Sequence, residues 1–308
     1  MIKEAINKGQ SFLISAHIRP DGDCLGAGFA LKRYIENAGK KADFMVDSDY
    51  PSHYAFLPGC EEYNKKQLNS YDYFIAVDCA DDKRLGIYAN FLQKLPSLNI
   101  DHHITNNKFA NKNIVKNYSS TCEILAEELA GTDFFDEKIA YLLYVGMSTD
   151  TGHFAHSNTN SRVLSNASKL LNYGFEPYEI IKNLYRNNTI QKTKLIGVAI
   201  NSMKFYNDNK ICFVTITKQN LNDCGCIISD TEGLIDYAVA IGSVEIAICL
   251  CEHSPKTYKV SFRSKGADVS VAASMFGGGG HKQAAGCIIS GFYEDVIQKL
   301  LRAVTECI

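Results

Sequence analysis

The chain has 308 residues, of which 46% are hydrophobic, and its 32 basic and 34 acidic side chains give a formal charge of −2. This length favours two domains, and the near-neutral charge excludes a protein that holds long duplex nucleic acid by charge alone. No stretch approaches the roughly 20 apolar residues of a membrane span, and no apolar signal-peptide core is recognisable. The 11 scattered cysteines are odd in number, which favours reduced thiols and a cytoplasmic location.

Predicted strands and helices alternate in the first half of the chain. Buried strands are expected over residues 11–16, 41–46, 73–77 and 98–100, and helices over residues 26–38, 121–129 and 138–145. Such alternation is typical of an α/β fold in which an open, mostly parallel sheet carries helices on both faces.

The pattern changes in the second half of the chain. Two further helices are expected over residues 177–186 and 190–204, and β-branched residues then predict strands over 211–217, 244–251 and 257–264. We therefore predict a first domain over residues 1–187, a helical connector over residues 188–204, and a smaller α+β domain over residues 205–308.

Acidic and imidazole side chains follow the predicted strands of the first domain. They form four clusters: His17, Asp21 and Asp23; Asp78; Asp101, His102 and His103; and Asp150, which is expected in a turn after an apolar helix. Ligands of open parallel sheets bind beyond the carboxyl ends of the strands. A single Asp at such a place is usually a cap or turn residue, and a single His is usually structural. Four clusters in sequence favour one shared site instead.

The chemistry of these clusters points to bound cations. Converging carboxylates repel each other unless cations neutralise them. Carboxylates and imidazoles without thiolates suit Mn²⁺ or Mg²⁺, and two cations bridged by one carboxylate are a common device for hydrolysing phosphate esters.

A glycine-rich segment lies near the C-terminus and reads MFGGGGHKQAAG over residues 275–286. Consecutive glycines let the backbone approach a ligand and present its N–H groups to a phosphate. A flexible linker is the alternative, and it is disfavoured because a strand is expected directly afterwards, over residues 287–289. Upstream, Arg263 can grip a phosphate with two N–H groups; the alternative is a solvated charge on an edge strand.

Together and in this order, the motifs resemble the DHH phosphoesterase family, named for the triplet found here as Asp101-His102-His103. The glycine-rich segment resembles its DHH-associated C-terminal domain. The resemblance implies an active-site cleft between two domains and two Mn²⁺ ions, with Mg²⁺ or Co²⁺ as alternatives. It implies that His17, Asp21 and Asp78 hold one ion, and that Asp23, Asp78, His102 and Asp150 hold the other, so that Asp78 bridges.

The same resemblance assigns the remaining roles. It implies a catalytic group in which His103 contacts the scissile phosphate and Asp101 supports the neighbouring imidazoles. It implies that the substrate is bound by Arg263, Gly279, Gly280 and His281, to which we add Arg84.

Within the family, the chain is similar to the compact bacterial type that degrades very short RNA, linear dinucleotides and 3′-phosphoadenosine 5′-phosphate (pAp). No extra nucleic-acid-binding fold or membrane span argues for another type. A cyclic-dinucleotide phosphodiesterase and a RecJ-like single-strand exonuclease are the enzymatic alternatives, and a non-catalytic nucleotide sensor is the third. A homodimer is compatible with each.

Overall fold

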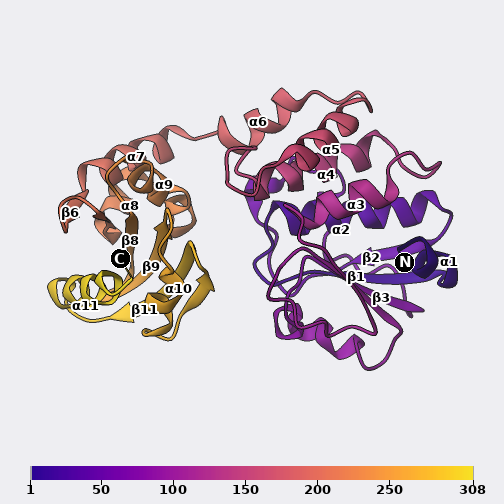
Figure 1. Cartoon of the computed structure of the whole chain (residues 1–308), viewed down its shortest axis with the longest axis horizontal. Coiled ribbons are helices and arrows are strands. Elements are labelled where there is room, and N and C mark those ends of the chain that lie inside the picture. The colour runs from indigo at the N-terminus through magenta and orange to yellow at the C-terminus, as the bar shows by residue number, and fades with distance from the viewer. Residues whose placement is uncertain (1, 308) are drawn as a thin grey trace. The chain divides into compact units, whose positions relative to one another are not determined.

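The computed structural model describes residues 2–307, and of His281 it describes only the backbone. Its internal contacts divide the chain into two units, Met1–Asn187 and Asn188–Ile308 (Figure 1). No helix within residues 2–307 is long and apolar enough to cross a membrane.

The first unit is built on a parallel sheet of five strands in the order β2-β1-β3-β4-β5. The strands are β1 (Ser11–Ser15), β2 (Lys41–Phe44), β3 (Tyr73–Val77), β4 (Ser97–Asp101) and β5 (Lys112–Val115). The chain runs from β1 to β2 on one side and returns to β3 on the other, so the strand order reverses between β1 and β3. Ligands of such folds bind at this reversal point.

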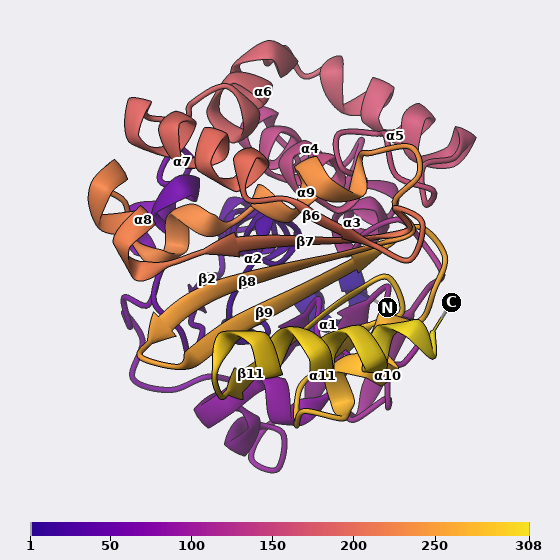
Figure 2. The ribbon, with the colours of Figure 1, turned by 90° about the vertical axis from the view of Figure 1, so that its left-hand side faces the viewer.

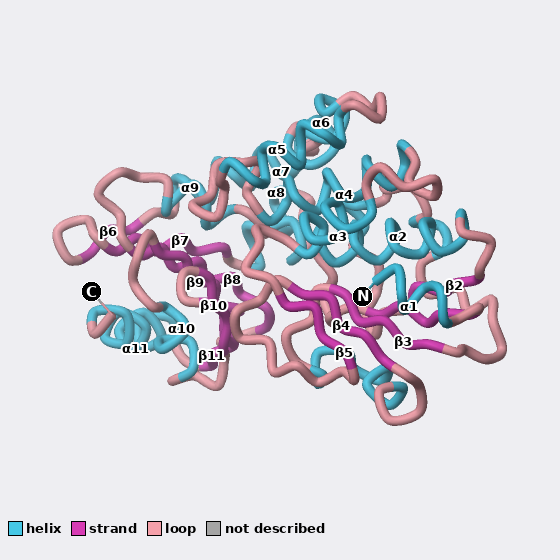
Figure 3. Tube along the Cα trace, turned by 45° about the vertical axis from the view of Figure 1, so that its right-hand side comes forward, coloured by secondary structure: helices cyan, strands magenta, loops and turns pink. Residues whose placement is uncertain are grey.

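The α-helices of the first unit lie on one side of this sheet, with α5 and α6 outside the others (Figure 3). They are α1 (Ile2–Lys8), α2 (Gly22–Asn37), α3 (Thr121–Leu129), α4 (Glu137–Asp150), α5 (Ser161–Leu171) and α6 (Pro177–Tyr185). Phe12 and Ile14 of β1 pack toward them, whereas Leu13 faces the opposite side. There Phe74 and Leu85 pack beneath a 3-10 segment, η3 (Asp82–Phe91). The expected α/β class is confirmed. Helices were expected on both faces of the sheet, and the second face carries the 3-10 segment η3 in place of α-helices.

Two helices of the first unit are longer than the sequence predicted. Helix α2 begins at Gly22 rather than at residue 26, because the Asp21 carboxylate caps it by accepting from the N–H groups of Asp23 and Cys24. Helix α4 runs on to Asp150 rather than ending at residue 145. The expectation that Asp150 lies in a turn is therefore wrong: it is the last residue of a helix.

The second unit is built on a six-stranded sheet in the order β10-β11-β9-β8-β7-β6, in which only the β7–β8 pairing is parallel. Its strands are β6 (Lys204–Tyr206), β7 (Ile211–Ile216), β8 (Ile246–Ser254), β9 (Thr257–Ser264), β10 (Gly279–His281) and β11 (Ala284–Ser290).

Helices cover both faces of the second sheet (Figure 2). One face carries α7 (Ile190–Asn201), α8 (Lys218–Cys224) and α9 (Leu234–Val239), and the other carries α10 (Val269–Ser274) and α11 (Tyr293–Thr305). Leu195 and Ala199 of α7 are buried against this sheet, so the segment expected to be a connector packs within the second unit.

Candidate metal centre

Asp78 lies at the centre of the site. It is the first residue after β3, its N–H donates to the carbonyl of Ile100 at 2.9 Å, and its side chain is buried. Its φ of +53° falls in the left-handed region that residues other than glycine adopt uncommonly. Such a conformation persists only where the surroundings fix it, and it is often found at functional sites.

One group of donor atoms joins the ends of β1 and β3. The Nε2 atom of His17 lies 3.4 Å from Asp78 Oδ2 and 3.7 Å from Asp21 Oδ2. The other imidazole nitrogen, Nδ1, donates to the carbonyl of Ile18 at 2.9 Å. This bond fixes the ring so that Nε2 faces the carboxylates, as is usual for a metal-binding histidine.

A second group of donor atoms lies on the other side of Asp78. The Nε2 atom of His102 lies 3.2 Å from Asp150 Oδ2, 3.4 Å from Asp78 Oδ1 and 3.9 Å from Asp23 Oδ2. Its Nδ1 atom donates to the carbonyl of Tyr118 at 3.3 Å. The structure therefore brings together all six residues for which the sequence predicted a metal-binding role.

The first turn of α3 supports two of these carboxylates. The fully buried carboxylate of Asp23 accepts from the backbone N–H groups of Thr121, at 2.7 Å, and Cys122, at 2.8 Å. A helix N-terminus favours a negative charge at this place. The Thr121 hydroxyl also donates to Asp78 Oδ1 at 3.1 Å. No local sequence pattern marks these contacts, because Thr121 lies 98 residues from Asp23 and 43 residues from Asp78 in the sequence.

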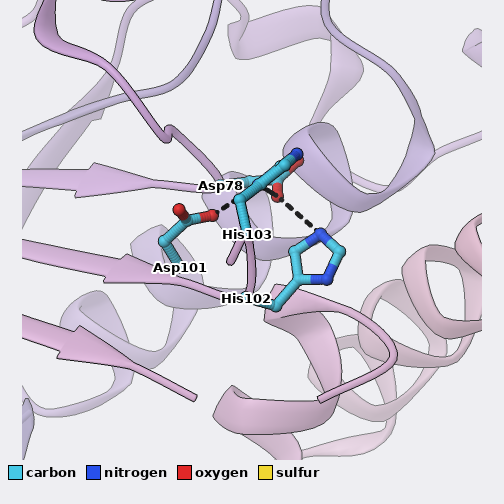
Figure 4. A group of neighbouring side chains, drawn as sticks. All are labelled: Asp78, Asp101, His102 and His103. Carbon is cyan, nitrogen blue, oxygen red and sulfur yellow. Dashed lines mark hydrogen bonds and ion pairs between the residues drawn. The ribbon is translucent and has the colours of Figure 1, made fainter. Parts of the chain in front are cut away.

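Asp101 and His103 form a further pair beside Asp78 (Figure 4). His103 Nδ1 lies 2.7 Å from Asp101 Oδ1 and 3.7 Å from Asp78 Oδ1. The second carboxylate oxygen of Asp101 accepts from Asn106 Nδ2 at 2.6 Å, and the same amide donates to the carbonyl of Cys79. Asn106 is a second residue that the sequence did not single out.

The electrostatics of the site reflect four aspartates and two imidazoles in close contact. Burial lowers the pKa of His17, but hydrogen bonds with Asp21 and Asp78 outweigh it and raise that pKa to about 10. The pKa of His102 is likewise lowered by burial but raised by Asp78 to about 11. Burial and the charge of Asp78 raise the pKa of Asp23 to about 7. Bound protons thus neutralise part of the negative charge of the clustered carboxylates, and divalent cations can replace these protons.

The donor chemistry fits divalent cations with a preference for oxygen and nitrogen. Three groups of side chains each place one ligand atom per residue within 4.8 Å of the others; among the described residues these are His17, Asp21 and Asp78; Asp23, His102 and Asp150; and Asp78, Asp101, His102 and His103. They contain only carboxylates and imidazoles, the set that suits Mn²⁺ and similar ions.

Comparisons with known proteins agree with this site. Residues 11–147 match the DHH family, N-terminal domain, and residues 229–308 match the DHHA1 domain. A bifunctional oligoribonuclease and PAP phosphatase NrnA from Thermus thermophilus is 31% identical over 95% of this chain and 89% of its own length. The chain belongs to the DHH family. The NrnA of Bacillus subtilis is 28% identical to this DHH protein, over 92% of the chain and 91% of its own length.

Solved structures show the same fold. An exopolyphosphatase-related protein from Bacteroides fragilis superimposes with a TM-score of 0.91 over 99% of this chain and 94% of its own, at 24% identity. RecJ from Thermus thermophilus, in complex with Mn²⁺, gives a TM-score of 0.54 over 99% of this chain and 53% of its own, at 14% identity. The predicted family and fold class are confirmed, and so is the predicted enzyme class, a hydrolase of phosphate esters.

The predicted substrate-binding residues of this DHH protein lie in both units. In the first unit, Arg84 is half-buried in η3, and its carbonyl accepts from the N–H of Ile18 at 2.8 Å. In the second unit, Arg263 on β9 pairs with Ala284 on β11, which pairs in turn with the backbone of His281 on β10. The side chain of His281 lies outside the described part of the chain.

The glycine-rich segment forms a hairpin rather than a linker. Packing requires a glycine at some of its positions and not at others. A Cβ at Gly278 would lie 2.2 Å from the carbonyl oxygen of Gly286, and one at Gly280 would lie 2.4 Å from that of Ala284. Both therefore permit the close pairing of β10 with β11. A Cβ at Gly279 would meet no atom within 4 Å, so packing does not require a glycine there.

Proposed function

We propose that the chain is a Mn²⁺-dependent phosphoesterase that hydrolyses very short oligoribonucleotides, linear dinucleotides and pAp. The curated relatives from Thermus thermophilus and Bacillus subtilis carry the name bifunctional oligoribonuclease and PAP phosphatase, and they align with nearly the whole chain. The near-neutral charge of −2 supports a ligand with few phosphates. The 11 free thiols support a cytoplasmic location.

The observation that carries the proposal is the position of Asp78 between two imidazoles. Its Oδ2 lies 3.4 Å from His17 Nε2, and its Oδ1 lies 3.4 Å from His102 Nε2. One carboxylate thus faces both groups of donor atoms. In this proposal His17, Asp21 and Asp78 hold one ion, and Asp23, Asp78, His102 and Asp150 hold the other.

Bound divalent cations supply an acidified water as nucleophile and neutralise charge that develops on the phosphoryl oxygens. The side chains of the protein orient the groups that contact the substrate. His103 is the residue proposed to contact the scissile phosphate, and Asp101 is a positioning residue, since it accepts the Nδ1 hydrogen bond at 2.7 Å and fixes the ring. Asn106 holds the second oxygen of Asp101 and thereby fixes the carboxylate itself.

The second unit is proposed to bind substrate through Arg263, Gly279, Gly280 and His281, and Arg84 is proposed to do so in the first unit. Gly279 fits this role because it lies in open space on an exposed hairpin, where a phosphate can approach the backbone. We propose residues 1–187 as the catalytic domain and residues 205–308 as the substrate-binding domain; the connecting segment, residues 188–204, packs with the latter.

A time course on three substrates tests this function. The substrates are a 5′-labelled RNA pentamer, a 24-nucleotide RNA and pAp, each with Mn²⁺ and with EDTA. We expect metal-dependent loss of the pentamer and pAp while the longer RNA is spared. Rapid degradation of the longer RNA would favour a RecJ-like exonuclease. No activity on any of the three would contradict the proposal and favour a cyclic-dinucleotide phosphodiesterase or a sensor.

A further inference from the structure

The loop between β5 and α3, residues 116–120, touches the candidate metal ligands from outside the site. The carbonyl of Tyr118 accepts from His102 Nδ1 at 3.3 Å. The Asn158 side-chain amide donates both to the carbonyl of Ser119, at 3.3 Å, and to that of Asp150, at 3.1 Å. The backbone of one loop is therefore linked to ligands that come from β4 and α4.

The buried carboxylate of Glu123 binds the 116–120 loop through hydrogen bonds. The side chain of Glu123, on the first turn of α3, is fully buried. Its Oε2 accepts from the N–H and the hydroxyl of Ser119, both at 2.8 Å. Its Oε1 accepts from Arg162 Nε at 3.0 Å and from Asn166 Nδ2 at 3.5 Å. A buried carboxylate needs such partners, since an unpaired one is strongly destabilising.

Arg162, on α5, holds the same loop from its outer side. While Nε pairs with Glu123, its Nη2 donates to the carbonyl of Asn117 at 3.2 Å. Its guanidinium also stacks on the ring of Tyr118, with 3.7 Å between the guanidinium carbon and the ring centroid. The planar fork of arginine makes these three contacts at once, which the single ammonium of lysine cannot do.

We propose that Glu123 and Arg162 are a positioning pair for the metal centre: they fix the 116–120 loop so that the Tyr118 carbonyl orients His102. Because that carbonyl binds Nδ1, the Nε2 atom faces Asp150 and Asp78. Supporting bonds of this kind commonly change metal affinity by about 10–100-fold when they are removed. The inference rests on the proposed metal site, but the orientation of His102 can be measured without a metal.

The alternative is that the pair only stabilises the fold, and Arg33 provides a matched control. Arg33 pairs with Asp136 through Nε, at 3.0 and 2.7 Å, and its side chain is 37% exposed, against 39% for Arg162. This second ion pair joins α2 to the start of α4, whereas Asp150 lies at the other end of that helix.

The test compares Arg162→Met with Arg33→Met in the full chain. Three quantities are measured: the Mn²⁺ dissociation constant, from free Mn²⁺ in electron paramagnetic resonance; the solvent exchange of the His102 Nδ1 proton, by NMR in metal-free protein; and stability to urea. We expect Arg162→Met to weaken Mn²⁺ binding about 10–100-fold and to speed exchange of that proton. Arg33→Met should leave both unchanged at comparable stability. Arg162→Lys should fall between wild type and Arg162→Met.

Wild-type Mn²⁺ affinity and wild-type proton exchange in Arg162→Met would overturn the inference. If that variant does not fold, Glu123→Gln replaces it, because it keeps the size of the side chain and removes the charge. A wild-type chain that binds no Mn²⁺ would contradict the proposed function, whereas the His102 proton still decides the positioning claim. The two failures are therefore distinguishable.

Discussion

Asp101 Oδ1 lies 2.7 Å from His103 Nδ1, the shortest contact between a carboxylate and an imidazole that is described in the site. Asn106 binds the other oxygen of Asp101 at 2.6 Å, so the carboxylate cannot turn without losing a bond. The imidazole is held in one orientation as a result. A group that must meet a phosphate in a set geometry gains most from such an arrangement.

Asp101→Asn should reduce kcat on pAp by about 10–100-fold with little change in KM, because an amide cannot accept from both His103 and Asn106. Steady-state kinetics measure both constants. Asp72→Asn is the control: Asp72 accepts from the N–H groups of Gln10 and Ser11, at the opposite end of β1. Equal kcat values in the two variants would contradict the role given to Asp101.

Alanine at two neighbouring glycines should separate packing from ligand approach. Gly280→Ala should lower stability by about 1–3 kcal/mol, because the φ of 149° and the nearby Ala284 carbonyl both oppose a side chain. Gly279→Ala should leave stability unchanged but raise KM for pAp several-fold. Urea unfolding and kinetics on both variants check this. An unchanged KM in Gly279→Ala would show that substrate does not approach at that backbone position.

Mn²⁺ binding should release protons. The pKa values of His17, about 10, and His102, about 11, mean that both imidazoles are protonated near pH 8, and a metal binds only the neutral ring. The apparent affinity for Mn²⁺ should therefore rise as the pH increases toward these pKa values. Calorimetry in buffers of different ionisation enthalpy measures the protons released. A binding enthalpy that is the same in every buffer would contradict this expectation.

The ion pair of Asp136 should make part of the stability depend on pH. Burial raises the pKa of Asp136, but the hydrogen bond from Arg33 outweighs it and holds the pKa below its usual value. A depressed pKa in the folded state adds stability above the unfolded value of about 4, and this is lost as the pH falls through the folded value. Asp136→Asn should cost about 0.5–1 kcal/mol at pH 7.

Urea unfolding of wild type and Asp136→Asn across this pH range is the measurement. The difference in unfolding free energy should shrink toward zero in acid, where both side chains are neutral. A difference that stays constant down to the acid limit would show that the charge of Asp136 contributes nothing.

The sequence predicted those elements whose local pattern and tertiary role agree. The strand at residues 73–77 and the helix at residues 121–129 have the predicted bounds, because a continuous apolar run and a serine cap mark them. Helix α2 was predicted to begin four residues too late, since Gly22 and Asp23 in its first turn have low helix propensity. Further along α2, Gly26 allows close packing: a Cβ would lie 2.5 Å from the carbonyl of Leu142 on α4.

Most residues of the candidate metal centre could be singled out because the carboxyl ends of neighbouring parallel strands meet at one edge of the sheet. Their supporting residues could not be predicted. Thr121 binds Asp78 across 43 residues of sequence, and Asn106 and Asn158 bind Asp101 and Asp150 from loops, so no strand or helix pattern marks any of the three. The edge strand β5 was missed for a related reason: of its four residues only Ile114 is buried.

The central claim is that Asp78 is shared by two metal ions that carry out phosphate ester hydrolysis. The most direct test is the rate of phosphate release from pAp by Asp78→Ala in saturating Mn²⁺, with circular dichroism to verify the fold. We predict that turnover falls below detection while the melting profile stays cooperative. Turnover close to that of the wild type in a folded Asp78→Ala protein would contradict the account.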